Sequence, residues 1–379
     1  MFLFVLALLP AIIYKKIRRH LWLICEYGNE AQDNGYAFFK YLKNAHKEID
    51  AVYAIRKKSL AYEKVARLGK TVEYGSLKHW VYYLAAEVNI SSQKGGKPNA
   101  AVCYLLEVVL GVLKNKRVFL QHGVIKDDLP FLHCDKAKVS MFACAAKPEY
   151  EFVRDTFGYP AGVVQYVGLC RFDALHGLTS DKNTILVIPT WRMWLERNSN
   201  ADKLTAFTHS AYYKEWTGLL NDKALWGLLD RYEKRLIFCM HRNMQAYEGL
   251  FTSNHSRIHI VNWRDADVSQ LLSTAGIMIT DFSSVYMDFA YMKKPVLYYQ
   301  FDRVDFRKNH LSIGYFDYDR DGFGPVCEHK ANLIKELEHI LKNDCEMPFK
   351  YQSKVDGFFT INDNKNCERT FEAIKSLLV

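Results

Sequence analysis

The chain has 379 residues, and its 51 Lys and Arg against 42 Asp and Glu give a formal net charge of +9. Hydrophobic residues make up 49% and charged residues 25%, which are ordinary proportions for a folded globular protein. These values exclude intrinsic disorder, a collagen-like chain and a small disulfide scaffold, and the length predicts two domains. A polytopic membrane protein is also excluded, because only the N-terminal stretch resembles a membrane segment.

Nine cysteines are spread along the chain without a CxxC pair. Their odd number and their positions within apolar runs predict buried free thiols in a reducing compartment. The ligand spacings of a zinc site are absent. We therefore expect a protein that faces the cytosol and has no dedicated metal cluster.

The N-terminal segment is apolar and is followed directly by basic residues. Residues 1–14 (MFLFVLALLPAIIY) carry no charge, and the next five residues include two lysines and two arginines. A secretory signal carries its positive charges before the apolar run. A helix of this length spans about 21 Å, less than the ~30 Å of a hydrocarbon core. We expect residues 1–20 to associate with anionic lipid headgroups at a membrane surface. The alternative is a first helix docked into the protein's own core.

Strand-like and helix-like segments alternate along the rest of the chain, which favours parallel sheets covered by helices. In the first half, the predicted strands are 21–26, 51–55, 88–91 and 117–121, and the predicted helices are 34–44 and 62–68. In the second half, the predicted strands are 184–188, 235–240, 258–261, 276–280 and 296–299, and the predicted helices are 212–228, 268–273 and 285–292.

Two α/β domains joined near residues 168–182 explain this alternation best. We expect domains at 21–175 and 176–345, with residues 346–379 packing back on the first domain. No GxGxxG or GxxxxGK[ST] loop occurs, which disfavours classical dinucleotide-binding and P-loop proteins. The sequence contains no basic patch interleaved with aromatics around a recognisable module, so nucleic-acid binding is not expected.

Polar residues follow four of the predicted strands. Ligands of open α/β sheets bind beyond the carboxyl ends of the strands, so residues in these positions are candidates for a binding site. They are His122-Gly123, Pro189-Thr190-Trp191-Arg192, His241-Arg242 and Asp281-Phe282-Ser283-Ser284. The set as a whole indicates one ligand-binding edge in each domain.

The segment 277–299 (IMITDFSSVYMDFAYMKKPVLYY) predicts a strand, a turn, a helix and a second strand. Ser283 or Ser284 can cap the helix through its hydroxyl. A helix N-terminus also suits a phosphate, because its backbone N–H groups are unpaired. The alternatives are a plain serine cap without a ligand and, for Asp288 one turn later, either a structural or a substrate contact.

The two histidines and two arginines allow more than one role. His122 precedes Gly123, where the backbone can pass close to a ligand, and a histidine can serve as a general base near neutral pH. A hydrogen-bonded histidine at a strand end is the alternative, for His241 as well. Arg171 and Arg192 can clamp phosphoryl oxygens or form ion pairs at a domain interface.

These motifs together resemble a known family. The run TDFSSVYMDFA at 280–290 resembles the TD[YF]SS-x3-D[FY]A signature of the CDP-glycerol glycerophosphotransferase family, which includes teichoic-acid primases and polymerases. Further matches are Gln121-His122-Gly123 to its HG motif, Pro189–Arg192 to its PTWR motif, His241 to its second-domain histidine, Gly168–Asp173 to its G-x2-R-x-D segment, and the stretches 33–35 and 38–41. The resemblance covers residues 20–345 in collinear order. Val124 and residues 125–128 depart from the family pattern, which leaves the acceptor less certain than the reaction.

The resemblance implies a GT-B fold, with two Rossmann-like domains facing across a cleft and the nucleotide on the C-terminal domain. It also implies attack by an acceptor hydroxyl on the β-phosphorus of CDP-glycerol, with release of CMP. His122 would be the general base, while His241 and Arg192 would hold the diphosphate with the two serines. Asp281 and Asp288 would orient the ribose or neighbouring donors. The implied site residues are His122 and His241 as catalytic residues and Gly123, Arg171, Thr190, Arg192, Arg242, Thr280, Asp281, Ser283, Ser284 and Asp288 as substrate-binding residues.

The expected function is glycerol phosphate transfer to a lipid-linked or polymer acceptor at the cytoplasmic face of the membrane, in the synthesis of teichoic-acid-like or capsule polymers. A CDP-ribitol or other alditol phosphate transferase remains an alternative, as do a GT-B glycosyltransferase using a nucleotide sugar and a catalytically silent membrane-binding module. No cofactor is expected, and the sequence does not decide whether Mg²⁺ accompanies the diphosphate. Oligomeric state and acceptor identity also stay open.

Overall fold

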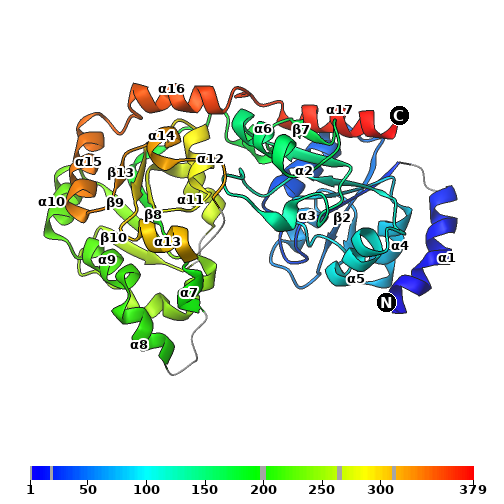
Figure 1. Cartoon of the computed structure of the whole chain (residues 1–379), viewed down its shortest axis with the longest axis horizontal. Helices are drawn as coiled ribbons and strands as arrows, with labels where there is room; N and C mark the ends of the chain where they lie inside the picture. Colours follow the sequence, from blue (N-terminus) through cyan, green and yellow to red (C-terminus); the bar gives the residue numbers. More distant parts are fainter. Residues whose placement is uncertain (1, 18–19, 197–201, 263–266, 310–312) are drawn as a thin grey trace. The chain divides into compact units, whose positions relative to one another are not determined.

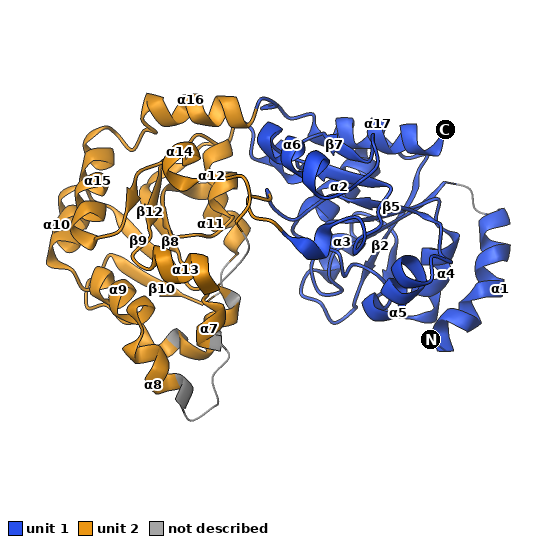
Figure 2. Ribbon diagram, in the orientation of Figure 1, with its two compact units in different colours: residues 1–124, 129–176, 360–379 blue, residues 125–128, 177–359 orange. Residues whose placement is uncertain are grey.

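The computed structural model describes residues 2–17, 20–196, 202–262, 267–309 and 313–379 (Figure 1). The chain forms two compact units. Unit 1 contains residues 1–124, 129–176 and 360–379, and unit 2 contains residues 125–128 and 177–359 (Figure 2). The expected boundary at 175 lies one residue from the observed one. Of the segment 346–379, only residues 360–379 belong to unit 1.

The sheet of unit 1 has seven parallel strands in the order β3-β2-β1-β4-β5-β6-β7. The strands are β1 (Leu21–Cys25), β2 (Asp50–Ile55), β3 (Thr71–Glu73), β4 (Val88–Ser91), β5 (Lys116–Phe119), β6 (Met141–Cys144) and β7 (Val164–Tyr166). Strands β1, β2, β4 and β5 confirm predicted segments. The central strand β1 is buried along its whole length, as a parallel strand covered on both faces must be.

Helices cover both faces of this sheet. They are α1 (Phe2–Ile17), α2 (Asn34–Ala45), α3 (Tyr62–Ala66), α4 (Leu77–Ala85), α5 (Ala100–Tyr104), α6 (Lys147–Thr156) and α17 (Asn366–Leu378), with short turns η1 (Leu105–Val109), η2 (Pro130–Leu132) and η3 (Cys170–Ala174). Because side chains alternate along a strand, Trp22 and Ile24 pack in the core that α2 and α17 share, whereas Leu21 and Leu23 pack in the core beneath α1 and α4.

Helix α1 packs on α4 by one face only. The rings of Phe4 and Trp80 lie 5.7 Å apart and those of Tyr14 and Tyr82 lie 5.0 Å apart, and Ala7 is fully buried. Large apolar side chains on the rest of α1 are exposed: Phe2, Leu3, Val5, Leu6, Leu8, Leu9, Ile12, Ile13 and Ile17. None of the described helices is both long and apolar enough to cross a membrane. Helix α1 therefore docks onto the protein, which was the alternative drawn from the sequence, and also presents an open apolar face.

The sheet of unit 2 has six parallel strands in the order β10-β9-β8-β11-β12-β13. The strands are β8 (Asp181–Ile188), β9 (Arg235–Cys239), β10 (Ile258–Val261), β11 (Ala275–Thr280), β12 (Val296–Tyr299) and β13 (Val326–Cys327). The five predicted strands of this half are confirmed. The apolar end of β8 and all of β11 are buried, and both belong to the core of this unit.

The helices of unit 2 are mostly short. They are α7 (Met193–Glu196), α8 (Asp202–His209), α9 (Ala211–Leu220), α10 (Lys223–Arg231), α11 (Val268–Thr274), α12 (Tyr286–Tyr291), α13 (Arg303–Asn309), α14 (Tyr318–Asp321), α15 (Lys330–Lys342) and α16 (Phe349–Phe358), with the 3₁₀ turn η4 (Arg242–Leu250). The predicted helix at 212–228 is two helices, because Asp222 caps α10 by accepting from the backbone N–H of Ala224.

Helix α17 returns to unit 1 and docks on η3 and on the glycine before it. The carboxylate of Asp173 accepts hydrogen bonds from the backbone N–H groups of Asn366 and Cys367, at 2.8 and 2.9 Å, and so caps the start of this helix. Gly168 has φ +82°, and a Cβ there would lie 1.8 Å from the side-chain oxygen of Asn366. Only glycine suits this position, for backbone conformation and for space.

Candidate functional site

The order of strands in unit 2 reverses between β8 and β11, which makes their carboxyl ends a topological switch point. Ligands of open α/β sheets bind at such a point. The loop after β8 contains Thr190, and the loop after β11 contains Asp281, Ser283 and Ser284; His241 follows the neighbouring strand β9. We call these three loops the unit 2 rim. Of the four predicted strand ends, three therefore adjoin one another in this sheet.

Asp281 ties the two central loops of the rim together. One of its carboxylate oxygens, Oδ1, accepts hydrogen bonds from the backbone N–H groups of Thr190 (2.7 Å) and Phe282 (2.6 Å). The hydroxyl of Thr280 donates to the carbonyl of Ile188 at 2.7 Å, which joins the last residues of β11 and β8. Both Thr280 and Asp281 are fully buried. They shape the rim from beneath, and the role they support is positioning.

Arg192 is the buried cation that balances this carboxylate. Its guanidinium lies 2.8 Å from Asp281 and forms a bidentate pair with Asp302, at 2.7 and 2.8 Å, while Nη1 donates to the carbonyl of Thr190. Burial alone would lower the pKa of Arg192, but the carboxylates of Asp281 and Asp302 outweigh it and hold that pKa above its ordinary value. The guanidinium is fully buried. Arg192 thus organises the rim through internal ion pairs, and a direct clamp on the diphosphate is not the role that these contacts support.

Three side chains of the rim can reach a ligand. Thr190 is buried, and its hydroxyl has no hydrogen-bond partner among the described residues. Ser283 is partly exposed and Ser284 is exposed. The serines do not cap a helix, which corrects the predicted cap: α12 begins at Tyr286, and its N-cap residue, Val285, makes no side-chain cap. What these residues offer is a set of hydroxyl groups on an open loop.

His241 is held in one tautomer by the backbone after it. The N–H of Asn243 donates to Nδ1 of His241 at 3.2 Å, so the neutral ring carries its proton on Nε2. The ring also lies nearly parallel to that of Trp191, at 6.2 Å between centroids. Nε2–H is therefore a fixed hydrogen-bond donor on the rim. The side chain of Arg242 lies outside the described residues, and Asp288 is buried in α12.

In unit 1, His122 follows β5 and is exposed. Gln121, the residue before it, has φ +60°, a left-handed conformation that is uncommon for a residue other than glycine. The side-chain amide of Gln121 holds it in place, because Nε2 donates to the carbonyl of Ala143 at 2.5 Å and to the carboxylate of Glu149 at 3.1 Å. The buried contacts of Gln121 hold a strained turn, and that turn presents His122 and Gly123 at the edge of the sheet.

Asn34 and Arg171 brace the same turn. Asn34 donates from its amide to the carbonyl of Gln121 (2.8 Å) and accepts from the backbone N–H of Arg171 (3.0 Å). Nη1 of Arg171 donates to Asp33 at 2.8 Å and to the carbonyl of His122 at 3.1 Å. The partner of Arg171 is thus Asp33, within unit 1, and these contacts support a positioning role for the arginine.

Glu26 is a buried carboxylate directly after β1. It accepts hydrogen bonds from the backbone N–H groups of Gln32, Asp33 and Tyr36, at 2.8–3.0 Å, and so shapes the loop that carries Asp33. Burial, followed by the nearby charge of Asp33, raises the pKa of Glu26 to about 7 despite these three hydrogen bonds. No cation is paired with Glu26 in the part of the chain that the structure describes.

The roles of Glu26, Asn34 and Asp302 were not predicted, although the stretch 33–35 was among the matches to the family pattern. Glu26 and Asp302 each stand within three residues of a strand end, after β1 and β12. A search of every strand end, and not only of four, would have found both. Asn34 could not be found in this way, because its two partners are distant in sequence. Within the described ranges, no group of three or more His, Cys, Asp or Glu side chains is placed to hold a metal ion. The nine cysteines are free, and eight of them are buried, as predicted.

The sequence matches the family model described as CDP-Glycerol:Poly(glycerophosphate) glycerophosphotransferase over residues 169–376, more than half of the chain. It is 29% identical to the minor teichoic acid biosynthesis protein GgaB of Bacillus subtilis over 373 residues, which are 95% of this chain and 40% of that protein. A shorter match, 28% identical over 109 residues, is to a teichoic acid poly(ribitol-phosphate) polymerase of Bacillus spizizenii and covers 28% of this chain and 16% of that polymerase. The chain therefore spans less than half of the length of these relatives.

Among solved structures, one of the wall teichoic acid polymerase TagF has a TM-score of 0.67 and 16% sequence identity, and the match covers 99% of this chain and 98% of that one. At this level of identity, the likeness shows the fold. The fold of this chain, with its two parallel sheets, is thus similar to that TagF structure over nearly all of its length.

Proposed function

Since this chain belongs to the CDP-glycerol:poly(glycerophosphate) glycerophosphotransferase family, we propose that it transfers glycerol phosphate from CDP-glycerol to an acceptor hydroxyl and releases CMP. The acceptor is a lipid-linked glycan or a polyol phosphate polymer, in the synthesis of teichoic-acid-like or capsule polymers. The observation that carries this proposal is the unit 2 rim, where hydroxyl groups and an imidazole donor gather at the switch point of a parallel sheet. Phosphoryl transfer depends mainly on positioning and charge stabilisation, which such a rim can supply.

The donor is bound by unit 2 in this proposal. Nε2–H of His241 and the hydroxyl groups of Thr190, Ser283 and Ser284 donate to the diphosphate oxygens, which carry more negative charge as the bond to CMP breaks. Arg192 and Asp281 hold the loops that carry these groups. Arg242 and Asp288 complete the proposed contacts, at the diphosphate and at the ribose or a neighbouring donor.

The acceptor is activated by unit 1. His122 accepts the proton of the attacking hydroxyl, and the oxygen then bonds to the β-phosphorus of CDP-glycerol while CMP leaves with the bonding electrons. Asn34, Arg171 and Gln121 fix the backbone on either side of this histidine.

The open face of α1 supports a membrane-associated acceptor. Nine large apolar side chains on this helix are exposed, and Lys15 and Lys16 lie in its last turn. An apolar face flanked by lysines suits the interface of an anionic membrane. We therefore extend the proposal to peripheral association with the cytoplasmic face of the membrane. Removal of residues 1–20 should abolish binding to anionic vesicles, and unchanged binding would refute this part.

A CDP-ribitol transferase is the second candidate, favoured by the match to a poly(ribitol-phosphate) polymerase. A panel of CDP-glycerol, CDP-ribitol and sugar nucleotides, assayed with a lipid-linked acceptor, separates these functions. The first proposal expects CMP release with CDP-glycerol above all others. Preference for CDP-ribitol would establish the second candidate, and release of a nucleoside diphosphate from a sugar nucleotide would make the protein a glycosyltransferase. No release from any donor would overturn the proposed enzyme.

A further inference from the structure

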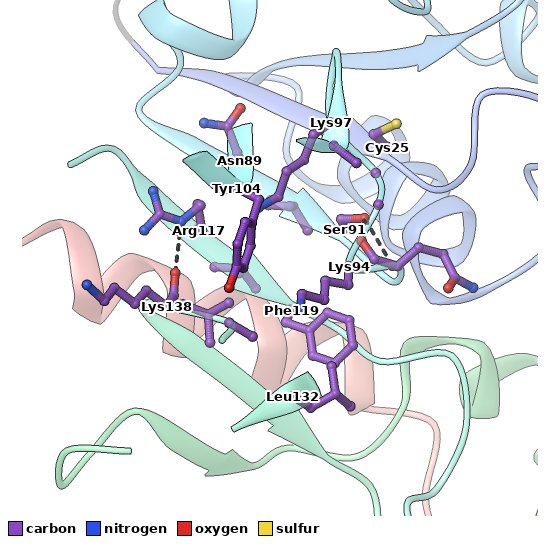
Figure 3. A pocket seen from close by; sticks show the side chains of 18 of the residues that line it. Cys25, Asn89, Ser91, Lys94, Lys97, Tyr104, Arg117, Phe119, Leu132 and Lys138 are labelled. Carbon is purple, nitrogen blue, oxygen red and sulfur yellow. Dashed lines mark hydrogen bonds between the residues drawn. The ribbon is translucent and has the colours of Figure 1, made fainter. Parts of the chain in front are cut away.

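Unit 1 contains a pocket of about 360 Å³ that is separate from the His122 turn (Figure 3). It lies over the face of the sheet that carries α4 and α5, and its floor includes Leu23 of β1 and Phe119 of β5. Residues from the loops after β1 and β4 also line it, and the strand order of this sheet reverses between those two strands. The pocket therefore reaches the switch point of unit 1, and its volume falls in the ~300–1,000 Å³ range of small-molecule sites.

The chain leaves this space open because two crossover connections are short of helix. Parallel strands are normally covered by a helix in each crossover. Here the β4–β5 connection contains only α5 and the π-helical turn η1, and the β5–β6 connection contains the short 3₁₀ turn η2. The floor is buried and apolar, since Leu23, Phe119 and Leu132 are each at most 5% exposed. An apolar chain or ring suits this interior.

The wall of the pocket is basic and is only partly neutralised. Its five cations are Lys94, Lys97, Arg117, Lys136 and Lys138, and no carboxylate lines it. Glu107 pairs with Lys97 and lies 3.6 Å from Arg117, and Asp135 lies 3.2 Å from Lys136. Lys94 and Lys138 instead donate to the carbonyls of Phe131 (2.6 Å) and Val108 (3.1 Å). Two cations are therefore left without a carboxylate among the described residues.

Two further observations fit an anionic ligand. Burial, and then the like charge of Lys97, lowers the pKa of Lys94, and an anion beside this lysine would offset both effects. Asn89, which lines the pocket and is 7% exposed, has a side-chain oxygen without a hydrogen-bond partner. A hydroxyl group on the ligand could satisfy this acceptor.

We propose that this pocket binds an amphiphilic anion, with an apolar chain on the floor formed by β1 and β5 and a phosphate head beside Lys94. The apolar floor accounts for the chain, and Lys94, which forms no ion pair among the described residues, accounts for the phosphate. This site contains none of the residues proposed to bind CDP-glycerol, so it stands or falls separately from the transferase activity.

The test is binding of decyl phosphate to the full chain, measured by isothermal titration calorimetry below the micelle concentration and without a nucleotide. Decyl glucoside and inorganic phosphate are the two matched probes, since each keeps one half of the ligand. We expect decyl phosphate to bind at least about tenfold more tightly than either probe. Each probe lacks either the apolar contacts of the chain or the charged hydrogen bonds of the phosphate. Equal binding of inorganic phosphate would show a plain anion site, and equal binding of decyl glucoside a plain apolar site; either overturns the proposal.

Variants locate the ligand. Val108→Trp fills the pocket, and its control is Val109→Trp, the exposed neighbour that does not line it. Lys94→Gln with Lys138→Gln removes the two cations, and Lys40→Gln with Lys47→Gln makes the same charge change on exposed residues elsewhere in unit 1.

We expect both pocket variants to weaken decyl phosphate binding about tenfold and both controls to keep it. Leu9→Ser with Ile13→Ser on the open face of α1 should also keep it. Unchanged affinity in the lysine pair, which is partly exposed and need not affect folding, would overturn the proposal even if the tryptophan variant misfolds. Loss of affinity in the α1 variant would place the ligand on that helix instead.

Discussion

Each unit has a buried carboxylate at its switch point, but only that of unit 2 is paired with a cation among the described residues. In each, a buried carboxylate directly after a central strand accepts backbone N–H groups and so fixes the adjoining loops: Glu26 in unit 1 and Asp281 in unit 2. Asp281 is paired with the buried Arg192, whereas burial raises the pKa of the unpaired Glu26 to about 7. Loop shape can thus be held by an ion cluster or by a carboxyl group that titrates near neutral pH.

The difference matters for what each loop can do. The ion cluster of unit 2 keeps Arg192 paired with two buried carboxylates, so the rim above it offers neutral donors in a fixed arrangement, which suits binding of a diphosphate. Unit 1 holds His122 on a strained turn that Arg171, paired with Asp33, braces from the side. We therefore assign binding chiefly to unit 2 and proton transfer to unit 1, and the predictions below test that division.

The largest expected effect is on turnover. His122→Ala should lower the rate of CMP release by about 10²–10⁴-fold, the usual contribution of a general base, and leave CDP-glycerol binding nearly unchanged. The measurement is kcat together with donor affinity. His176→Ala, an exposed histidine of the same unit, is the control and should behave like the unchanged protein. Near-normal CMP release from the first variant would refute the assignment of the base.

Arg192→Met should give the largest effect on stability. It leaves the carboxylates of Asp281 and Asp302 buried without a cation, which costs about 3–5 kcal/mol of the free energy of unfolding. Chemical denaturation measures this loss, and Arg231→Met, which removes an exposed ion pair of unit 2, should change it by no more than about 1 kcal/mol. A small loss for both variants would mean that the cluster does not hold the rim together.

Glu26 should make the free energy of unfolding depend on pH near neutrality. Between its ordinary value of 4.5 and a folded-state pKa of about 7, the folded protein binds the proton more tightly than the unfolded chain. The free energy of unfolding should therefore fall as pH rises through this window, by up to ~1.4 kcal/mol per pH unit from this group. Urea titrations at several pH values measure this slope. Glu26→Gln should remove that part of it, and an identical slope in this variant would contradict the shift.

The smallest expected effect is on the rim hydroxyls. Ser283→Ala with Ser284→Ala should weaken CDP-glycerol binding about 30-fold, since each of the two lost hydrogen bonds to a charged oxygen contributes about 1 kcal/mol. Ser269→Ala with Ser273→Ala, on α11 of the same unit, is the matched control. Equal donor affinity in both pairs would place the diphosphate elsewhere on unit 2.

The sequence could predict the elements and the edge of the sheets, because both follow from local patterns. Apolar runs such as TILVI and GIMIT become buried strands, and the residue after a parallel strand necessarily stands at the carboxyl edge. The rim positions of Thr190, His241 and Asp281 follow from that rule alone. Strands β3, β6, β7 and β13 were missed, and all of them except β6 are only two or three residues long.

The roles of the charged residues could not be predicted in the same way. Arg192 was expected to face a ligand, but its partners, Asp281 and Asp302, are about 90 and 110 residues away in sequence. Asx and serine side chains near a helix start likewise predict a cap, and at Ser284 the chain turns for two more residues before α12 begins. Ion-pair partners and helix starts of this kind depend on which groups the fold brings together. A local sequence pattern therefore does not predict them.

The docking of α17 on Gly168 and Asp173 has a consequence for how the protein is made. Unit 1 is discontinuous in sequence, so its first 176 residues leave the ribosome before the roughly 180 residues from 177 to 359 that build unit 2. At ~5–20 residues per second, this delay lasts about 10–40 s. During that time, the core face containing Trp22 lacks its cover from Phe371 and Ile374. Unit 2 can therefore finish folding first, and the nascent N-terminal half is the part that a chaperone would meet with its apolar side uncovered.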